Sequence, residues 1–571
     1  MSLANKHWQI APPIPENLVQ QFSEFGLDPL MAQLLYNRGV ASPQEAKEFF
    51  EGESEGNPFD LPEMNEAVTR LRHAIRKGEP IVVYGDYDAD GVTATALLTD
   101  VLGSLGARVD AYIPHRVDEG YGLHIEALEE LSGRGCKLVV TVDCGIRSIP
   151  EAEWAHDHGL DLIITDHHSV GETLPPGIAR IDPKRPGSRY PFADLSGVGV
   201  AYKLAQALLR THQQVPIVTD AHPVREEDLL DLVVLGTVAD LAPLVGENRI
   251  LVKKGLGAIN RTQRPGLREL LASSGLQGPV SASHIGYVLG PRLNAAGRLD
   301  TAMDSYRLLA TRSVEEARAL ASKLEGCNRE RQQQTAEAVE MARALALQDG
   351  DLAPLIFVAT PGIIGGIAGL VASKLTEEFY RPSVVIGEES KHGISRGSAR
   401  SIPELNITAM LDQCSHLLVR HGGHAAAAGF EVENCLLDTL REQLAQMAEE
   451  QLRGRNLVPT LQVDAEVPLE HMTWKTLGDL QRLEPHGYSN RAPIFVSRRV
   501  QVRDSRIVGE KHLKLTLSDG KAAWDAIAFR QAERASGLSR YVDIAFSVEV
   551  NSWNGQDRLQ LNVKDMHSSV S

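Results

Sequence analysis

The chain is poor in cysteine and has no long apolar run. Its five cysteines are scattered through 571 residues and form no C-x-x-C pair, so neither a disulfide framework nor a zinc ribbon is indicated. Cys144 follows an aspartate, but a small buried side chain explains it better than a nucleophile does. No stretch reaches the ~18–20 apolar residues that cross a bilayer. The N-terminus also lacks the apolar segment of a secretory signal. We therefore expect a cytoplasmic protein that does not enter a membrane.

Basic residues are also fewer than acidic residues. The sequence has 58 Lys and Arg against 75 Asp and Glu, a formal net charge of −17. This balance argues against a protein that merely coats nucleic acid. It does not exclude a nuclease, because metal ions and local basic patches can contact phosphates while the rest stays acidic. Internal repeats and low-complexity tracts are missing too, and the length suggests about three or four domains.

Strand-like and helical patterns alternate between about residues 61 and 240. This alternation predicts a parallel α/β sheet with right-handed crossovers. The strand-like runs are 81–84, 107–114, 137–142 and 161–165, and the helical segments between them are 92–105, 124–133 and 149–158. Residues 196–210 should open with a glycine-rich turn and continue as a helix, and 226–240 should form another apolar helix that ends at Asp240. Residues 241–310 are mostly helical in pattern, with a polar interruption at 291–300.

A helix of about 35 residues is expected next, because apolar residues recur there at helical spacing. Ser313 and Glu316 have the spacing of a capping box at its start. Its middle, NRERQQQT at 328–335, is almost wholly polar. Two interpretations remain open for this polar waist: the helix connects two lobes, or the waist is simply a solvated face.

The remaining segments suggest three further parts. Residues 1–60 look peripheral, with a proline-rich start and a short helix. Residues 353–450 carry a second, smaller α/β pattern. From about 459 the chain turns to short alternating strands around one helical insertion at 530–536, which is typical of a small barrel such as an OB-fold. The expected boundaries are 1–60, 61–312, 313–350, 351–455 and 456–571.

Carboxylates end several of the apolar segments. Asp86, Asp88 and Asp90 alternate in GDYDADG directly after a strand, and three carboxylates this close repel one another unless cations neutralise them. An EF-hand is the main competing metal site, but its twelfth position would be Leu97 and not glutamate. Asp143 follows a second strand, and Asp240 ends an apolar helix where a buried carboxylate needs a partner.

An aspartate and two histidines, Asp166-His167-His168, close the run LIIT. Side chains at the carboxyl ends of parallel strands converge on one crevice. Carboxylate and imidazole suit divalent cations such as Mn²⁺ and Mg²⁺. A metal-bound imidazole usually needs an acceptor for its other nitrogen, and Asp166 or a neighbouring carboxylate would serve. Since adjacent histidines do not readily face one ion, one is expected to bind metal and the other substrate phosphate. The residues alone therefore predict a two-metal phosphoesterase.

The ordered set GDYDADG, DCG (143–145), DHH and GTVAD (236–240) resembles the four motifs of the DHH phosphoesterase superfamily. The segments 114–123, 196–204 and 290–299 narrow the resemblance, together with the length, to the RecJ family of bacterial single-strand-specific 5′→3′ DNA exonucleases. The resemblance covers the chain from about residue 60 onward. It implies a parallel-sheet DHH domain joined by a long helix to a smaller α/β DHH-associated domain, followed by an OB-like barrel.

The resemblance also implies a set of site residues. Two Mn²⁺ or Mg²⁺ ions would be held by Asp88, Asp90, Asp143, His167 and Asp240, with Asp86 in the same motif. Asp143 would bridge the ions and His168 would contact the scissile phosphate. Many members of the superfamily outside the RecJ family have a histidine where this chain has Tyr84, and Asp86 is expected to compensate for it.

Substrate contacts are implied by the later motifs. HGISRGSARS (392–401) and HGGHAAAAG (421–429) resemble the DHH-associated domain, whose Gly422-Gly423-His424 loop approaches nucleotide. Ser398, Arg400 and Arg116 are candidates for the 5′-terminal phosphate. Arg292, Arg298 and Asn294 would contact the backbone or support the metal site. Ile364-Gly365 replaces a Trp-His pair that is common in the family, and LEPHGYSN (483–490) replaces its usual glycine-acidic-x-Asn turn. Trp524, Phe529, Tyr541 and Trp553 either stack bases or pack in the barrel.

The resulting hypothesis is a monomeric exonuclease that hydrolyses single-stranded DNA to 5′-mononucleotides in repair and recombination. The resemblance implies a RecQ-type helicase and a single-strand-binding protein as partners. Three alternatives remain: a nanoRNase or cyclic-dinucleotide phosphodiesterase, a pyrophosphatase, and a catalytically inactive single-strand-binding scaffold. The barrel argues against the first, the GGH-type loop against the second and the intact metal motifs against the third.

Overall fold

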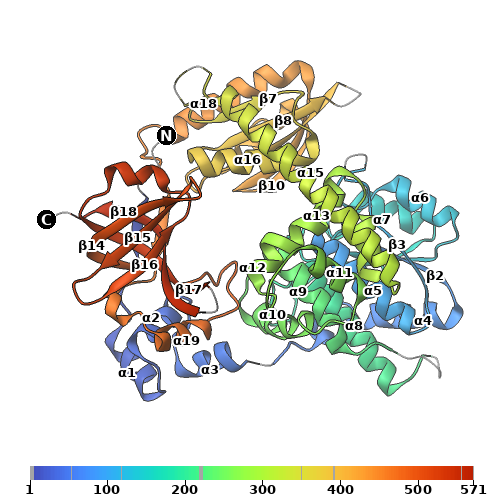
Figure 1. Cartoon of the computed structure of the whole chain (residues 1–571). Coiled ribbons are helices and arrows are strands. Elements are labelled where there is room, and N and C mark those ends of the chain that lie inside the picture. Colours follow the sequence, from blue (N-terminus) through green and yellow to red (C-terminus); the bar gives the residue numbers. More distant parts are fainter. Residues whose placement is uncertain are drawn as a thin grey trace. The chain divides into compact units, whose positions relative to one another are not determined.

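The computed structural model describes residues 6–52, 54–116, 119–217, 223–348, 350, 352–389, 393–553 and 556–569 (Figure 1). Parts of two motifs, 117–118 and 390–392, therefore lie outside the described residues. The chain forms two compact units. The large unit comprises Glu55–Ala242 and Glu247–Leu457, and the small unit comprises Met1–Ser54, Pro243–Gly246 and Val458–Ser571.

A five-stranded parallel sheet organises the first half of the large unit, as the sequence predicted. Its strand order is β3-β2-β4-β5-β6. The strands are β2 (Pro80–Tyr84), β3 (Arg108–Tyr112), β4 (Leu138–Val142), β5 (Asp161–Thr165) and β6 (Ala179–Ile181). The four predicted strands are confirmed, whereas β6 was missed because three residues are too short for a periodic pattern. Helices α4 (Met64–Lys77), α5 (Ala89–Ser104), α6 (Ile125–Gly133) and α7 (Ile149–Asp157) connect and cover the sheet.

The order of the strands fixes where ligands are bound. The chain leaves β2 for the edge strand β3, then returns past β2 to β4 and continues outward to β5. The direction of winding thus reverses between the neighbouring strands β2 and β4. In doubly wound sheets, the crevice beyond the carboxyl ends of such a pair is the usual binding site. The predicted metal motifs follow these two strands and β5.

A helical layer completes this half of the unit. It comprises α8 (Gly197–Gln214), α9 (Leu230–Ala239), α10 (Gly246–Ile259), α11 (Pro265–Ser273), α12 (Ala282–His284), a π-helical turn (Ile285–Leu289), α13 (Gly290–Leu299) and α14 (Met303–Ala310). The interpretation of 291–300 as a polar interruption is wrong. Pro291 lies in the first turn of α13, where it is compatible with a helix. Leu293, Ala296 and Gly297 are buried on one side, so the polar residues form a helix face.

The long helix α15 (Val314–Ala346) is confirmed, including its cap. The Ser313 side chain accepts a hydrogen bond from the Glu316 backbone N–H, but the Glu316 carboxylate instead binds Arg307 and Thr311. The first half of α15 packs against α11, α13 and α14. Its second half packs against α16 (Gly365–Phe379) and β7 (Ile356–Ala359). The helix therefore joins the two α/β layers of the large unit.

The second layer is a mixed five-stranded sheet in the order β10-β11-β9-β8-β7. Its remaining elements are β8 (Ser383–Glu389), β9 (Ile394–Arg400), α17 (Ile407–Gln413), β10 (Leu418–His424), β11 (Ala427–Glu433) and α18 (Leu437–Leu452). Only β7 and β8 are parallel. The glycine-rich segment predicted to approach nucleotide forms the β10–β11 hairpin, in which Gly423 pairs with Ala428.

The small unit is a closed barrel, because β14 pairs with both β15 and β17. Its strands are β13 (Ala465–Glu466), β14 (Phe495–Val508), β15 (His512–Ser518), β16 (Ala523–Ala528), β17 (Tyr541–Trp553) and β18 (Gln556–Ser568). A 3₁₀ turn at Ala532–Gly537 is the predicted helical insertion. Helix α19 (Trp474–Gln481) precedes the barrel.

Residues 6–52 are an integral part of the barrel unit. Strand β1 (His7–Ile10) pairs in parallel with β12 (Thr460–Val463), and the indole of Trp8 donates to a buried carboxylate of Asp565 at 2.8 Å. Helices α1 (Glu16–Glu24), α2 (Pro29–Tyr36) and α3 (Pro43–Glu51) follow. They contribute Phe22, Leu34 and Leu35 to the same core as Phe495 and Leu513. The apparently peripheral segment thus shares the core of the barrel.

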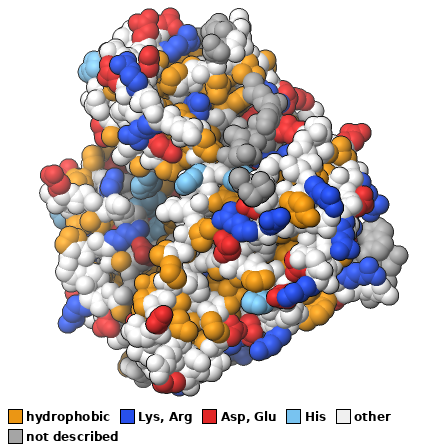
Figure 2. Space-filling view, turned by 90° about the vertical axis from the view of Figure 1, so that its left-hand side faces the viewer, with side chains coloured by type: hydrophobic (Ala, Val, Ile, Leu, Met, Phe, Trp, Pro, Cys, Tyr) orange, Lys and Arg blue, Asp and Glu red, His pale blue; other side chains and the backbone are white. Residues whose placement is uncertain are grey.

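Charged side chains of both signs lie on the surface of the molecule. On the face shown in Figure 2, Lys and Arg side chains are interspersed with Asp and Glu and do not form one basic belt. In the described part of the chain, no helix combines the length and apolar character needed to cross a membrane.

One buried ion cluster ties the start of the large unit to its helical layer. Lys203 on α8 is fully buried, and its Nζ lies 2.6 Å from Glu247 and 3.2 Å from Glu55. The same Glu247 accepts a hydrogen bond from the hydroxyl of Tyr190 at 2.7 Å. Removing one partner from such a cluster leaves a buried charge without compensation.

We expect the substitution Lys203→Met to lower the free energy of unfolding by about 3 kcal/mol. Lys254 is the matched control, because it contacts the same Glu55 at 2.7 Å from a partly exposed position. Lys254→Met should cost less than about 1 kcal/mol. Urea unfolding followed by tryptophan fluorescence measures both values. Equal decreases in the free energy of unfolding of the two variants would contradict the stabilising role of the buried Lys203 cluster.

Candidate metal centre and phosphate-binding pocket

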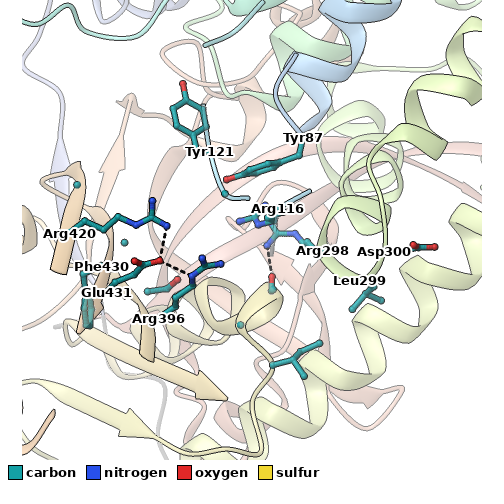
Figure 3. A pocket seen from close by; sticks show the side chains of 18 of the residues that line it. Tyr87, Arg116, Tyr121, Arg298, Leu299, Asp300, Arg396, Arg420, Phe430 and Glu431 are labelled. Carbon is teal, nitrogen blue, oxygen red and sulfur yellow. Dashed lines mark hydrogen bonds and ion pairs between the residues drawn. The ribbon is translucent and has the colours of Figure 1, made fainter. Parts of the chain in front are cut away.

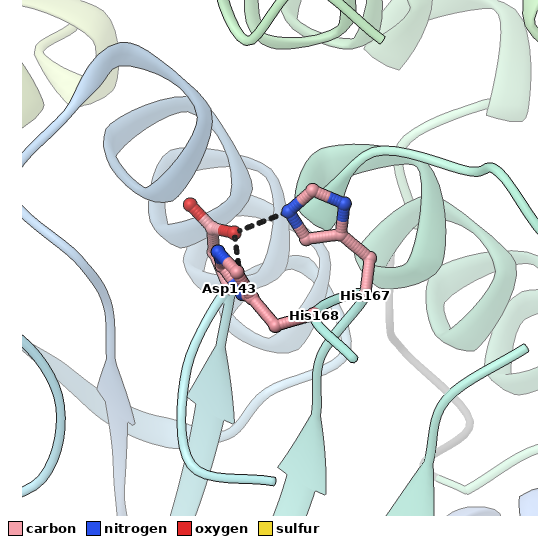
Figure 4. Close-up of side chains that lie close together, drawn as sticks. All are labelled: Asp143, His167 and His168. Carbon is pink, nitrogen blue, oxygen red and sulfur yellow. Dashed lines mark ion pairs between the residues drawn. The ribbon is translucent and has the colours of Figure 1, made fainter. Parts of the chain in front are cut away.

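The predicted metal ligands lie together at the carboxyl edge of the first sheet. The ligand atoms of Asp86, Asp88 and Asp143 are within 4.8 Å of one another. A second group with the same spacing consists of Asp90, His167 and Asp240, and a third joins Asp143 to both histidines (Figure 4). The Nε2 atom of His167 is 3.0 Å from Asp143 Oδ1. Asp143 therefore stands between two candidate cation sites, as a bridging ligand would.

Two helix N-termini hold the carboxylates of the first motif. Asp88 is the N-cap of α5, and its side chain accepts hydrogen bonds from the backbone N–H groups of Asp90 and Gly91. The Asp90 carboxylate accepts from the N–H groups of Gly197 at 2.7 Å and Val198 at 2.8 Å, at the start of α8. Unpaired N–H groups and the helix dipole both favour negative charge there. The glycine-rich turn before α8 is therefore part of the metal centre.

Glycine is required where the carboxylates pass close to the backbone. A Cβ atom on Gly197 would lie 2.6 Å from Asp143 Oδ1, and one on Gly236 would lie 2.6 Å from Asp90 Oδ1. Asp143 itself has φ 62°, a conformation that costs free energy for a residue with a side chain. Such strain is typical of functional positions, since the surroundings must hold the residue in place.

The centre stores strong electrostatic repulsion. Burial and the neighbouring aspartates raise the pKa of Asp86 and Asp143 well above the usual range. The same two causes raise the pKa of Asp90 to about 7 and that of Asp240 to about 9. Asp86 Oδ1, Asp143 Oδ1 and His167 Nε2 are buried, and among the described residues they have no hydrogen-bond partner. Oxygen and imidazole atoms left unpaired in one crevice fit divalent cations.

His167 is suited to bind a cation as a neutral imidazole. Burial, and then the charge of His168, lower the pKa of His167 to about 3. The backbone of Leu195 hydrogen-bonds to its ring, which leaves Nε2 facing the carboxylates. The acceptor that orients this ligand is thus a backbone group and not Asp166.

Asp166 instead organises His168. Its carboxylate accepts hydrogen bonds from the backbone N–H groups of His167 and His168 and lies 2.7 Å from His168 Nδ1. Burial alone would raise the pKa of Asp166, but the hydrogen bond from the His168 side chain and the charges of the two histidines lower it to about 2. Burial alone would lower the pKa of His168, but Asp166 raises it to about 9. The hydroxyl of Tyr121 lies 3.1 Å from the same ring nitrogen. A cationic His168 at the rim is suited to meet a phosphate.

The Tyr84 side chain does not offer a ligand atom to the metal centre. It is fully buried, and its hydroxyl donates to the backbone carbonyl of Gly122 at 3.1 Å. Burial raises its pKa, so the phenol stays neutral. Tyr84 thus anchors the loop that carries Tyr121, and Asp86 supplies the carboxylate nearby.

Figure 3 shows a pocket of about 860 Å³. It adjoins the metal centre through Tyr87, between Asp86 and Asp88 in the chain, and through Tyr121, whose hydroxyl lies 3.1 Å from His168 Nδ1. It is lined from the first layer by Tyr87, Arg116, Gly120, Tyr121, Arg298, Leu299 and Asp300, from α15 by Cys327, Glu330 and Gln334, from α16 and its approach by Ile364, Gly365 and Gly366, and from the second sheet by Arg396, Gly397, Ser398, Arg420, His421, Gly422, Gly429, Phe430 and Glu431. Four of the predicted substrate residues are among them: Arg116, Arg298, Ser398 and Gly422.

Arginines crowd one side of this pocket. The guanidinium of Arg116 lies 4.6 Å from the centre of the Tyr87 ring, and Arg298 lies next to it in Figure 3. Burial, followed by Arg116 and Arg331, lowers the pKa of Arg298 to about 9. Burial and Arg116 also lower the pKa of Arg400. Cations that repel one another in a partly buried pocket favour an anion such as phosphate.

The other predicted contacts lie outside this lining. Arg292 pairs with Glu325 at 2.7 Å and supports the packing of α13 on α15. Arg400 donates to the carbonyl of Ala399, and neither Gly423 nor His424 is a lining residue of the pocket as described. The Oδ1 atom of Asn294 is buried and has no hydrogen-bond partner in the described ranges. These roles stay predictions.

Several lining residues were not predicted. Glu330 and Gln334 come from the polar waist of α15 and Cys327 directly precedes it, so this waist is neither only a connector nor only a solvated face. The polar composition of residues 328–335 was the feature of the sequence that could have predicted this. Arg396 and Arg420 both bind Glu431 at 2.7 Å across the β9, β10 and β11 strands, as the dashed lines in Figure 3 show. Alternation along these strands could have placed them on one face.

The departures from the family pattern are accommodated locally. Ile364 precedes α16, and Gly366 allows this helix to approach Arg298, since a Cβ there would lie 2.3 Å from the Arg298 carbonyl oxygen. In LEPHGYSN, the side-chain amide of Asn490 donates to the carbonyls of Leu483 and Pro485 and thereby closes the turn.

The barrel aromatics divide into two kinds. Trp524 packs against the barrel core and lines a second pocket of about 460 Å³ with Trp474 and Arg558. Phe529 is half exposed, and Tyr541 lies under Arg499 and Arg540. The side chain of Trp553 lies outside the described part of the chain. Base stacking by these residues stays a prediction.

Comparisons with known proteins agree with this geometry. Three family descriptions match: DHH family, N-terminal domain, over residues 80–237; DHHA1 domain over 353–454; and RecJ OB domain over 463–565. Their spans fall on the first sheet layer, the second layer and the barrel.

Relatives and solved structures match nearly the whole chain. The Bacillus subtilis (strain 168) protein named single-stranded-DNA-specific exonuclease RecJ is 37% identical over 571 residues, which cover 99% of this chain and 71% of that protein. Its Escherichia coli (strain K12) namesake is 34% identical over 559 residues, which cover 95% and 96%. The crystal structure of RecJ in complex with Mn²⁺ from Thermus thermophilus has a TM-score of 0.84 at 30% identity and covers 99% of this chain and 80% of that one. This chain therefore belongs to the RecJ family of DHH phosphoesterases.

Proposed function

We propose that this protein is a metal-dependent exonuclease that degrades single-stranded DNA from its 5′ end to 5′-mononucleotides. The observation that carries the proposal is the placement of an arginine-lined pocket beside a carboxylate-imidazole centre in the same unit. One site would hold a terminal phosphate and the other would cleave the next phosphodiester. The names of the relatives, single-stranded-DNA-specific exonuclease RecJ, support the same substrate class.

The residues would be shared between two cations. Asp86, Asp88 and Asp143 form one ligand set, and Asp90, His167 and Asp240 form the other, with Asp143 available to both. Two bound divalent ions, Mn²⁺ or Mg²⁺, supply an activated water and neutralise the charge that develops on the phosphate. Asp166 keeps His168 protonated, so that this imidazolium donates to a phosphate oxygen. Strained Asp143 is held ready to bind and need not reorganise.

The pocket would determine which phosphodiester bond of the strand is cut. Arg116, Arg298, Ser398 and Gly422 line the space that a 5′-terminal phosphate would fill. Arg400, Gly423 and His424 would add contacts beyond this lining. Arginine suits this task because its planar fork binds two phosphate oxygens at once. A terminus fixed at one distance from the metal centre releases one nucleotide per cut.

We further propose the biological setting and the domain limits. The protein would act as a cytoplasmic monomer in DNA repair and recombination, with a RecQ-type helicase supplying single strands and a single-strand-binding protein presenting them. The catalytic domain would span 61–312, the connecting helix 313–350, the substrate-binding domain 351–455 and the nucleic-acid-binding barrel 456–571. Residues 1–60 would form an N-terminal extension.

The substitution Asp143→Ala should reduce metal-dependent cleavage by at least about a thousandfold, because both candidate cation sites lose a shared ligand. A 5′-labelled and a 3′-labelled single strand, each tested with duplex and RNA counterparts, measure cleavage and its polarity. Circular dichroism and thermal unfolding of the variant confirm that the fold persists. Activity retained by a folded variant would contradict the proposal.

Removing the cation should make stability fall as pH rises. The folded protein holds protons on Asp90 and Asp240 with pKa values of about 7 and 9, against about 4 in an unfolded chain. This contribution is complete below pH 4 and is lost as pH rises through the two folded values. Mg²⁺ replaces these protons, so it should raise the thermal midpoint more at pH 8.5 than at pH 6. Differential scanning fluorimetry measures the effect, and Asp143→Asn should reduce it. An equal rise at both pH values would contradict the assignment.

Arg116→Ala should raise KM about tenfold for a 5′-phosphorylated strand and much less for a 5′-hydroxyl strand, because a hydrogen bond to a charged group is lost. Arg225, an exposed arginine paired with Asp228, provides the control: Arg225→Ala should leave both KM values unchanged. Steady-state kinetics on the two substrates compare them. A uniform change for both substrates would show that Arg116 does not bind the terminal phosphate.

A further inference from the structure

A tyrosine with an almost fully exposed ring stands on the π-helical turn before α13. Tyr287 is 85% exposed, although Ile285 and Leu289 on either side of it are fully buried. Single π-turns are rare and often occur at functional sites, where they turn one side chain outward. An exposed aromatic ring on a rigid, well-packed turn is a surface suited to a flat ligand.

This turn packs on the end of the helix that delivers Asp240. A Cβ atom on Gly290 would lie 3.2 Å from Ala239, and one on Gly286 would lie 3.9 Å from Val238. Leu241 follows the aspartate with φ 58° and is 65% exposed. Holding a leucine in the left-handed region costs free energy, and exposing it gains no burial in return. Leu241 is thus the exposed neighbour of Asp240 in the chain, and Tyr287 is exposed on the turn that packs against the same helix end.

Helix α13 connects this turn to the arginine-lined pocket. Helix α13 begins where the π-turn ends, and its last turn brings Arg298 into the pocket. At 1.5 Å per residue the helix spans about 15 Å between these ends. Asn294 lies between them, and its buried Oδ1 has no hydrogen-bond partner in the part of the chain that the structure describes. Tyr287, Asn294 and Arg298 thus follow one another along the π-turn and α13, from the exposed ring to the arginine-lined pocket.

We propose that Tyr287, supported by Leu241, is a base-stacking platform for the DNA strand on the 3′ side of the scissile phosphate. This inference rests on the proposed exonuclease function. If the 5′ phosphate occupies the pocket, the strand that leaves the metal centre runs toward the N-terminal end of α13, where Tyr287 lies. A ring face binds any base, which suits a nuclease without sequence preference. Only an unpaired base can turn its face onto the ring, so the platform favours single strands.

The test combines protein and substrate changes. Each substrate is a 5′-phosphorylated 12-mer with one abasic residue at the second, third, fourth or fifth nucleotide, compared with the intact 12-mer. In the unchanged protein, one of these positions should raise KM on the order of tenfold, the loss expected for one stacked base. Tyr287→Ala should raise KM similarly for the intact strand and should abolish the penalty at that one position. Tyr287→Phe should restore it.

The controls separate stacking from a general defect. Phe25 is an exposed aromatic residue outside the segments proposed to bind DNA, and Phe25→Ala should keep the full abasic profile. Leu241→Ala should weaken the penalty without changing its position. An abasic profile that Tyr287→Ala leaves intact would overturn the platform, as would equal effects of Tyr287→Ala and Phe25→Ala. Failure of the unchanged protein to cleave any intact single strand would instead overturn the proposed function itself.

Discussion

Five aspartates share one crevice at the carboxyl edge of the first sheet, and their mutual repulsion is the constraint on which the large unit depends. Without cations, the carboxylates can stay together only by keeping protons, as the raised pKa values of Asp90 and Asp240 show. The surrounding chain is arranged to tolerate this. The start of α8 neutralises Asp90, glycines make room for side chains, and Asp143 is held in a strained conformation. A fold that stores repulsion in this way is completed by divalent ions.

Much of this arrangement could be predicted from the sequence, because strong local patterns carried it. Alternating apolar runs revealed four strands of the sheet, and topology alone then placed the motifs after β2, β4 and β5 on one edge. Other features depended on long-range packing that no local pattern encodes. Strand β6 is too short to recognise, and α13 was hidden because its polar face was mistaken for a loop. The side chain of Asp166 pairs with the ring of His168 and not with that of His167. This pairing depends on the backbone conformation of the DHH triplet, which the sequence pattern does not encode.

The two α/β layers contribute different chemistry to one reaction path. The first layer concentrates negative charge and so attracts metal ions, whereas the pocket between the layers concentrates arginines and so attracts phosphate. A net charge of −17 is compatible with nucleic-acid binding for this reason, since the attractive groups are gathered in one place and not spread over the surface. The polar waist of α15 belongs to the same pocket, which explains why this helix is hydrophobic near its ends and polar in its middle.

The barrel unit is assembled from segments that lie far apart in the chain. Trp8 donates to Asp565, a separation of 557 positions, and β1 pairs with β12. During synthesis on the ribosome, helices α1 and α2 have no partner for Phe22, Leu34 and Leu35 until the barrel strands have been made. The large unit can fold in the meantime, since domains generally fold as units in the order of their synthesis. The small unit can therefore complete its core only after the barrel strands have been made, and until then the apolar residues of α1 and α2 lack their native partners.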